Sequence, residues 1–327
     1  MDNGEEADRE QYRGELRLFA YLMSGSIKES EWIAEYVLDS AAGVSDPGRS
    51  PLSLLYGQAV AACVGRLEGR PRRSLPSLVV PPSDPELPPG AGTDAQVWLE
   101  PFPDDLFPDS LKAPDPSREY GSRECISLYM AAALQDIDPR GRAAFIMSDL
   151  LGWSSDLPGL FPDVEERELL TLLDGAREKM THSYKRDLGR RSPPPDQDAT
   201  TMSMRYLYPW ETADIDGLAE RLAEDVVFQN PPSPSWYRGR DAFERFARKN
   251  LFPEGSPGRW RLLPSRAGGQ LAFGTYHVEK NRRLYVAHSI QVLFFDEGLV
   301  SEIVCFEDAD LFQLMGLLPE VVVQGSI

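Results

Sequence analysis

Residues 285–306, YVAHSIQVLFFDEGLVSEIVCF, decide the fold of the C-terminal part of the chain. Two runs of β-branched and aromatic residues flank the tripeptide Asp296-Glu297-Gly298, and this spacing predicts a β-hairpin with the glycine at a positive φ. Periodicity and length predict two further strands and two helices before the hairpin, at residues 259–263, 270–277, 206–223 and 241–249. Helices followed by an antiparallel sheet predict an α+β domain over residues 200–320.

The N-terminal half of the chain has apolar residues at helical spacing and is predicted to be all-α. Its predicted helices are residues 10–23, 29–42, 52–67, 123–134, 140–151 and 164–180. The proline-rich stretch between the third and fourth helices predicts a linker. The predicted fold class is therefore an α+β multidomain protein. Its parts are a helical domain over residues 1–72, a Pro-rich linker over 73–117, a second helical domain over 118–191 and the α+β domain.

Composition restricts the classes of function. The chain has 327 residues, with 52 acidic against 34 basic side chains and a net charge of −18. This excess of acid argues against a protein held to DNA by a broad basic face. No apolar run is long enough to span a membrane, and Cys63, Cys125 and Cys305 are too far apart to form a CxxC pair. We therefore expect a cytoplasmic protein with no membrane partner, no metal site and no cofactor.

Several ordered motifs point to a known family. They are WLEPFPD at residues 98–104, RECISLYMAAALQ at 123–135, DPRGRA at 138–143, LLGWS at 150–154, PPSPSWYRGRDA at 231–242, GRWRL at 258–262 and IQVL at 290–293. With them, most of the chain resembles the extracytoplasmic-function bacterial sigma factors that carry a C-terminal SnoaL-like domain. The resemblance implies helical domains like sigma regions 2 and 4, which bind core RNA polymerase and read promoter elements. It also implies a cone-shaped SnoaL-like domain around a pocket.

The region 2-like sequence departs from the family pattern. Residues 29–41 keep an amphipathic frame but lack the Gln-Glu and Arg-Ala-Trp of the family's polymerase-binding helix. Residues 54–65 carry alanine and valine where a polar face would read a melted DNA strand. The basic residues that remain nearby are Arg66, Arg70, Arg72 and Arg73. They are either contacts for nucleic acid or the solvated start of a linker.

The region 4-like sequence departs further. Pro158-Gly159 falls where the first helix of the helix-turn-helix is expected, and an interior proline costs a helix about 3 kcal/mol. Residues 163–168, DVEERE, place four acids at the start of the expected recognition helix, where they would face DNA phosphates. Acids there suit the helix dipole and its capping instead. The sequence therefore predicts a degenerate helix-turn-helix, with DNA binding weak or absent.

The C-terminal domain keeps its family pattern, and its aromatic content suits a pocket for an apolar ligand. The candidate ligand-binding residues are Tyr206, Trp210, Phe228, Asn230, Trp236, Tyr237, Tyr276 and Gln291. The alternative for each aromatic residue is ordinary core packing.

Catalysis in such a pocket would need a proton donor or acceptor that titrates near neutral pH. Alternation along the strand places His288 on its more apolar face, so we expect His288 to point inward. Asp308 or Glu307, at the end of the next strand, is its expected acid/base partner. In a regular strand Gln291 would face the other side. The alternative for His288 is a satisfied core histidine.

Two main hypotheses follow from the sequence, and a third, a purely structural partner protein, would apply if the pocket were filled by its own side chains. In the first, a sigma-like protein has lost ordinary promoter recognition and works through its pocket on a small apolar, polyketide-like molecule. Its reaction would be a cofactor-free cyclisation, isomerisation or dehydration in natural-product biosynthesis. In the second, the chain is a divergent sigma factor or transcription regulator that binds core polymerase, and its SnoaL-like tail is a regulatory domain.

Overall fold

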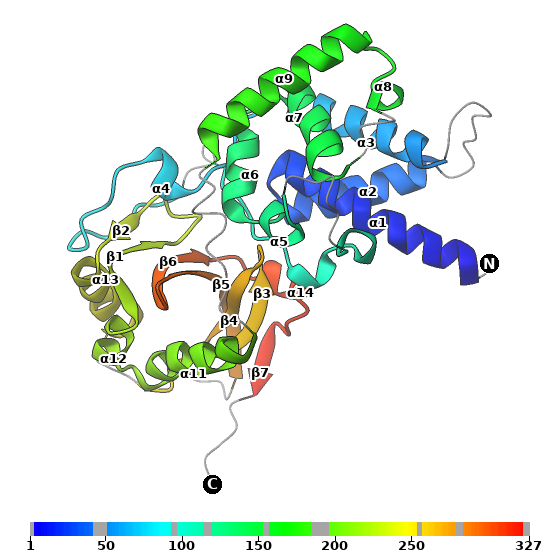
Figure 1. The fold of residues 1–327 in the computed structure, drawn as a ribbon. Helices are drawn as coiled ribbons and strands as arrows, with labels where there is room; N and C mark the ends of the chain where they lie inside the picture. The colour runs from blue at the N-terminus through cyan, green and yellow to red at the C-terminus, as the bar shows by residue number, and fades with distance from the viewer. Residues whose placement is uncertain are drawn as a thin grey trace. The chain divides into compact units, whose positions relative to one another are not determined.

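The computed structural model describes residues 3–41, 51–92, 97–113, 120–152, 157–184, 196–253, 257–278 and 284–322. The chain forms two compact units (Figure 1). The helical unit comprises Met1–Ser74 and Leu99–Arg190, and the sheet unit comprises Leu75–Trp98 and Arg191–Ile327. Leu75–Trp98, here called the inserted segment, therefore belongs to the sheet unit although it lies between the two stretches of the helical unit in sequence.

The helical unit confirms the all-α prediction. Its described elements are α1 (Asn3–Ser24), α2 (Ile27–Ala41), α3 (Pro51–Leu67), η1 (Asp104–Leu106), η2 (Asp109–Leu111), α5 (Ser122–Cys125), α6 (Leu128–Gln135), α7 (Pro139–Phe145), the π-helical turn η3 (Ile146–Leu150), α8 (Leu157–Leu160) and α9 (Glu166–Ser183). Helix α1 is central, because residues 15–24 are all buried and α1 contacts α2, α3, α6 and α7. The two stretches that the sequence suggested as separate helical domains thus pack into one unit.

A buried arginine joins these stretches. Arg142 of α7 is 4% exposed and donates from Nη1 to the carbonyl oxygen of Met23, near the end of α1. It also donates to Gln135 Oε1 at 2.9 Å and to the carbonyl oxygens of Gln135 at 3.2 Å and Ile137 at 2.8 Å. The last carbonyls of a helix lack partners inside that helix, and a cation is favoured at this end. Arg142 therefore stabilises the carboxyl ends of α1 and α6 together.

The WLEPFPD stretch is structured rather than a free linker. Leu99 N donates to the Ser74 carbonyl and Glu100 N to the Gly25 carbonyl, both at 3.0 Å. The Glu100 carboxylate accepts from Ser26 Oγ at 2.8 Å, at the start of α2. Gly25 has φ +72°, and a Cβ there would lie 2.5 Å from Leu99 Cδ2. The turn between α1 and α2 thus favours glycine through its backbone angle, and any larger residue there would also have to displace the Leu99 side chain.

The sheet unit contains a seven-stranded sheet of order β2-β1-β6-β5-β4-β3, with β7 paired to β5. The strands are β1 (Leu222–Gln229), β2 (Trp236–Arg238), β3 (Trp260–Ala267), β4 (Gln270–Val278), β5 (Leu284–Asp296), β6 (Leu299–Phe306) and β7 (Glu320–Val322). The pairs are antiparallel except β1 with β6. The helices are α4 (Pro76–Val79), α11 (Asp196–Thr212), α12 (Ile215–Ala219), α13 (Arg240–Phe246), the π-helical turn η4 (Ala247–Leu251) and α14 (Leu311–Leu314).

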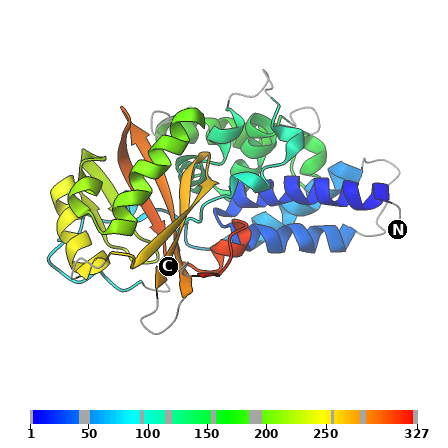
Figure 2. The same cartoon turned by 90° about the horizontal axis from the view of Figure 1, so that it is seen from below.

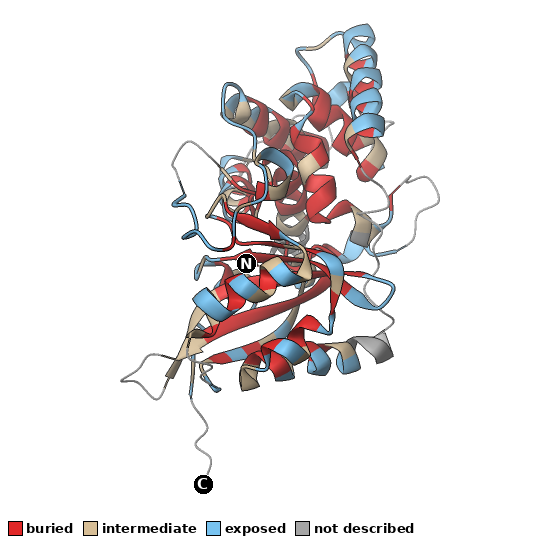
Figure 3. Cartoon of the chain, turned by 90° about the vertical axis from the view of Figure 1, so that its left-hand side faces the viewer, coloured by how far each residue is buried: buried red, intermediate tan, exposed pale blue. Residues whose placement is uncertain are grey.

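Helices α11, α12 and α13 lie along one face of the curved sheet (Figure 2). Between them and the strands lies an aromatic core, whose rings include Tyr206, Trp210, Phe228, Tyr237, Phe243, Phe246, Trp260 and Phe273. The central strands are buried along most of their length, whereas exposed residues collect on the outer sides of the helices (Figure 3). The prediction of an α+β multidomain protein is thus confirmed.

Local differences from the predicted elements have identifiable causes. The helix expected at 206–223 ends at Thr212, because Ala213 leaves the helical conformation with φ +56°. Asp214 then caps α12 by accepting from Gly217 N at 2.9 Å. The predicted hairpin turn is present, with Gly298 at φ +82°. Strands β1, β2 and β7 were missed, since two are three residues long and β1 carries two adjacent acids in LAEDVVFQ.

In the region 4-like part, Pro158 lies in the first turn of the short helix α8, a position that tolerates proline. Helix α9 begins with exposed Glu166 and Glu168. Glu165, its N-cap residue, makes no side-chain capping hydrogen bond, so the expected capping role is wrong there and only the dipole argument remains. The family's WS pair at 153–154 lies outside the described residues. No described helix is both long and apolar enough to cross a membrane.

Candidate functional site: a pocket in the sheet unit

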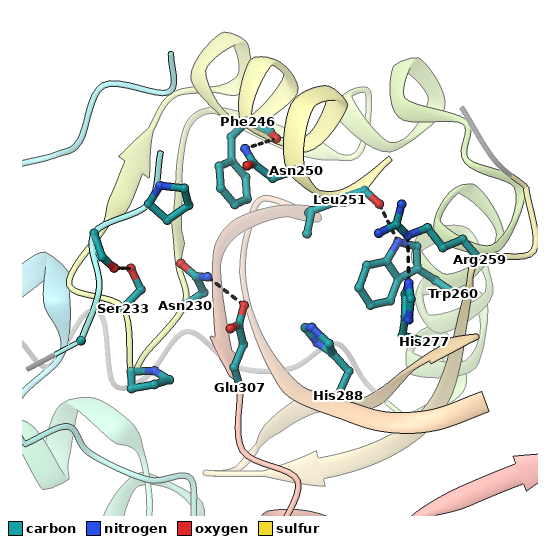
Figure 4. Close-up of a pocket in the computed structure, with 14 residues that line it drawn as sticks. Asn230, Ser233, Phe246, Asn250, Leu251, Arg259, Trp260, His277, His288 and Glu307 are labelled. Atoms are coloured by element: carbon teal, nitrogen blue, oxygen red, sulfur yellow. Dashed lines mark hydrogen bonds between the residues drawn. The ribbon is translucent and has the colours of Figure 1, made fainter. Parts of the chain in front are cut away.

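The sheet unit holds a partly open pocket of about 460 Å³ (Figure 4). Its lining residues are Pro89, Gly90, Gly92, Asn230, Pro232, Ser233, Phe246, Asn250, Leu251, Arg259, Trp260, His277, His288 and Glu307. They come from the inserted segment, the loop after β1, helix α13 with η4, strands β3, β4 and β5, and the end of β6. The volume lies within the ordinary range for small-molecule sites, about 300–1,000 Å³.

His288 reaches the pocket through a β-bulge. Thr275 pairs with Ser289 and Tyr276 with Ala287, which leaves His288 as an extra residue on β5. Beyond the bulge, Leu293 belongs to the aromatic core. Because side chains alternate along a strand, the even-numbered residues after the bulge face away from this aromatic core. Simple alternation also predicts that Ile290, Val292 and Phe294 share the inward face of His288. That prediction is wrong, because the bulge changes the parity and His288 alone of these residues faces inward.

The surroundings of His288 favour its neutral form. Its ring meets the Trp260 ring edge to face, with centroids 5.0 Å apart. Burial lowers the pKa of His288 below its usual value, Glu307 opposes this shift, and Arg259 adds to it. Nδ1 of His288 is buried without a hydrogen-bond partner in the described part of the chain. A neutral imidazole with an unpaired ring nitrogen is a group that can take or give a proton.

On one side of the pocket, Asn230 and Glu307 form a polar pair (Figure 4). Asn230 Nδ2 donates to Glu307 Oε1 at 2.9 Å, and the Glu307 amide donates to the Pro231 carbonyl at 2.9 Å. Asn230 is 6% exposed, and its Oδ1 has no partner among the described residues. An unpaired buried acceptor costs about 1–3 kcal/mol. The bond to Glu307 thus fixes the amide and leaves a hydrogen-bond acceptor unused at the pocket.

On the other side, Arg259 and His277 lie beside Trp260 (Figure 4). Arg259 Nε donates to His277 Nε2 at 3.0 Å, so that nitrogen carries no proton. The His277 ring meets Trp260 edge to face at 5.0 Å, and Trp260 Nε1 donates to the Leu251 carbonyl at 2.9 Å. The lining has one acidic side chain, Glu307, and one basic side chain, Arg259, so its formal charge is zero when the histidines are neutral.

The predicted catalytic residues separate into two groups. His288 and Glu307 both line the pocket, but Asp308 does not. Asp308 Oδ1 accepts from Asp310 N at 3.0 Å, in the turn before α14. Within the described ranges no three His, Cys, Asp or Glu side chains gather as metal ligands. The catalytic roles remain predictions.

Of the eight predicted ligand-binding residues, Asn230 lines this pocket. Tyr206, Trp210, Phe228 and Tyr237 lie in the aromatic core. There, Tyr206 Oη donates to Gln291 Oε1 at 2.8 Å. Tyr276 Oη donates to the Leu318 carbonyl at 2.9 Å, and Trp236 Nε1 donates to the Val80 carbonyl at 2.8 Å. The ligand-binding candidates from the sequence left out Asn250, Leu251, Arg259, His277 and the inserted segment, and also Phe246 and Trp260, which had counted only toward the aromatic content that suggested a pocket. The GRWRL motif was the available signal for Arg259 and Trp260.

In the helical unit, the basic cluster at and after the end of α3 is paired with carboxylates of the same unit. Glu29 accepts from Arg66 and from Arg70 at 3.0 Å, and Arg73 lies 3.7 Å from the same carboxylate. Arg72 pairs with Asp136 at 3.3 Å. These contacts favour the interpretation of this cluster as structural.

Comparisons with known proteins agree with the fold. A family profile described as a SnoaL-like domain matches residues 204–303. The ECF RNA polymerase sigma factor SigG of Mycobacterium tuberculosis is 32% identical over 317 residues, in both strain CDC 1551 / Oshkosh and strain H37Rv. The alignment covers 95% of this chain and 83% of SigG.

The crystal structure of the M. tuberculosis extracytoplasmic function sigma factor SigJ superposes with a TM-score of 0.57. It covers 95% of this chain and 99% of SigJ at 19% identity, which supports the fold alone. Identity to SigG extends through both the helical unit and the sheet unit. The chain therefore belongs to the ECF RNA polymerase sigma factors, with a SnoaL-like domain at residues 204–303.

Proposed function

We propose that the chain is a divergent ECF sigma factor that binds core RNA polymerase and is regulated by its SnoaL-like domain. The observation that carries this proposal is the 32% identity to SigG across 95% of the chain, which includes the helical unit. A pocket enzyme alone would not require the helical unit to keep this similarity. The comparisons thus favour the second hypothesis from the sequence over the first.

Helix α2 offers a surface suited to the polymerase. It occupies the place of the family's polymerase-binding helix, and its Trp32 and Tyr36 are each 51% exposed. Their rings stack with centroids 5.3 Å apart, and the Arg66 guanidinium lies 4.6 Å from the centre of the Trp32 ring. Exposed tryptophan, tyrosine and arginine are the residue types that most often carry the binding energy of protein interfaces. These rings replace the missing Gln-Glu and Arg-Ala-Trp residues.

The test is equilibrium binding of the full chain to purified core polymerase, followed by transcription on a library of promoters. Trp32→Ala should weaken binding by about 30-fold, since an interface hot spot contributes about 2 kcal/mol or more. The matched control is Tyr208→Ala in the sheet unit, where Tyr208 is 63% exposed. Absence of wild-type binding at micromolar concentration would overturn the proposal.

A second candidate function is cofactor-free proton transfer in the pocket. It is favoured by the lowered pKa of His288 and by its buried Nδ1, which has no hydrogen-bond partner among the described residues. Glu307 would then orient or exchange protons with His288, and the substrate would be a small apolar, polyketide-like molecule. His288→Ala should abolish any conversion that the purified chain performs. An unchanged rate would exclude His288 as its acid or base.

A further inference from the structure

The inserted segment is bound to the rim of the pocket by several hydrogen bonds. Gly90 N donates to Ser235 Oγ at 2.7 Å, and Ser233 Oγ donates back to the Gly90 carbonyl at 2.8 Å. Ser83 N donates to the Trp236 carbonyl at 2.7 Å. Ser233 also lines the pocket. The loop after β1 therefore both binds the inserted segment and forms part of the pocket wall.

The approach of the inserted segment is closest at Gly92. A Cβ on this residue would lie 2.7 Å from the Pro232 carbonyl oxygen, a distance that side chains do not tolerate. Pro89, Gly90 and Gly92 all contribute to the pocket wall. A molecule in the pocket would therefore contact both the inserted segment and the C-terminal part of the sheet unit.

The chemistry of the lining defines what fits. Phe246, Leu251 and Trp260 supply apolar walls. Asn230 Oδ1 is a buried acceptor with no partner among the described residues, and the bond from Asn230 Nδ2 to Glu307 fixes its orientation. The charges of Glu307 and Arg259 cancel, so a ligand with a net charge would be attracted by one of them and repelled by the other, and a neutral ligand is favoured.

We propose that the pocket binds a neutral molecule with a flat apolar ring system and a hydroxyl or N–H donor directed at Asn230 Oδ1. Binding of this molecule holds the inserted segment against the loop after β1, because the inserted segment forms one wall of the site. The inserted segment joins the two stretches of the helical unit in sequence, so its attachment restrains the path between them. The regulatory part of this inference rests on the proposed sigma-factor function.

The experiment uses the full chain with 2-naphthol, a flat neutral ring system with a donor, and 2-methoxynaphthalene, which lacks the donor. Calorimetric titration should show 2-naphthol binding about tenfold tighter, the effect of one hydrogen bond to a buried acceptor. Asn230→Leu should remove this preference. Hydrogen exchange should then be measured for peptides covering residues 76–92. At 2-naphthol concentrations ten times its Kd, exchange that requires release of the bound molecule should slow about tenfold.

Gly92→Ala should weaken 2-naphthol binding and speed exchange in residues 76–92, whereas Gly121→Ala, with open space at its Cβ, is the matched control. Equal affinity for the two naphthalenes, or no binding at millimolar concentration, would overturn the ligand chemistry. This comparison needs only the wild-type chain, so it stands even if Asn230→Leu fails to fold. Binding without slower exchange would overturn the link to the inserted segment. Core polymerase binding is measured without either naphthalene, so failure of the sigma-factor proposal gives a separate result.

Discussion

Replacing Arg142 by methionine should lower the free energy of unfolding of the helical unit, because this side chain connects α1, α6 and α7. The side chain makes four hydrogen bonds to carbonyl oxygens. Burial lowers the pKa of Arg142 to about 10, so the guanidinium still carries its charge at neutral pH. Hydrogen bonds from a charged donor contribute about 1.5–3 kcal/mol each, and the cost of burying the charge offsets several kcal/mol of their sum. We expect a net loss of about 3 kcal/mol on substitution.

Thermal unfolding followed by calorimetry measures this loss. A destabilisation of about 3 kcal/mol should lower the Tm of the helical unit by about 6–12 °C. Arg140→Met is the matched control, because Arg140 lies in the first turn of the same helix, its side chain is 52% exposed and it lies 3.9 Å from Glu68. The reasoning is refuted if Arg142→Met melts at the same temperature as Arg140→Met.

Three further predictions concern the pocket, the basic cluster and the hairpin. Since the pKa of His288 is lowered in the native domain, the unfolded chain takes up a proton more readily once the pH falls below about 6.5. The free energy of unfolding should be highest above that pH and should decrease as the pH falls through the native pKa of His288. Urea unfolding of His288→Gln at several pH values should show a smaller decrease. A profile identical to that of the wild type would contradict the lowered pKa of His288. Glu29→Gln should free basic side chains and steepen the salt dependence of non-specific DNA binding by about one phosphate contact, measured by anisotropy. Gly298→Ala should cost about 1–2 kcal/mol in chemical unfolding because of its positive φ, and an unchanged midpoint would speak against this turn.

The sequence was sufficient for features that depend on local pattern. The hairpin of β5 and β6 has alternating apolar residues and a glycine turn, and the helices have clear periodicity, so both were predictable. Strand β1 was not, because the acids at 224 and 225 hide its apolar residues and its neighbours in the sheet come from distant parts of the chain.

The pocket was only partly predictable for a related reason. His288 was singled out by its residue type, but its inward position depends on a bulge that strand alternation cannot reveal. Asn230 was anticipated, whereas the contact that fixes its amide is a bond to Glu307, 77 positions away in sequence. The proline-rich stretch gave no signal that it would form a pocket wall, since its contacts are hydrogen bonds to a loop more than a hundred residues later.

The interleaved course of the chain has a practical consequence for dissecting the protein. The polypeptide enters the sheet unit after Ser74, leaves it after Trp98 and enters again after Arg190. An expression fragment that starts at residue 191 would lack the Val80 carbonyl that accepts from Trp236 Nε1, and the Gly90 amide that donates to Ser235. Cleavage at one peptide bond cannot yield either unit whole. A transplant of the SnoaL-like domain into another protein must therefore bring residues 75–98 with it.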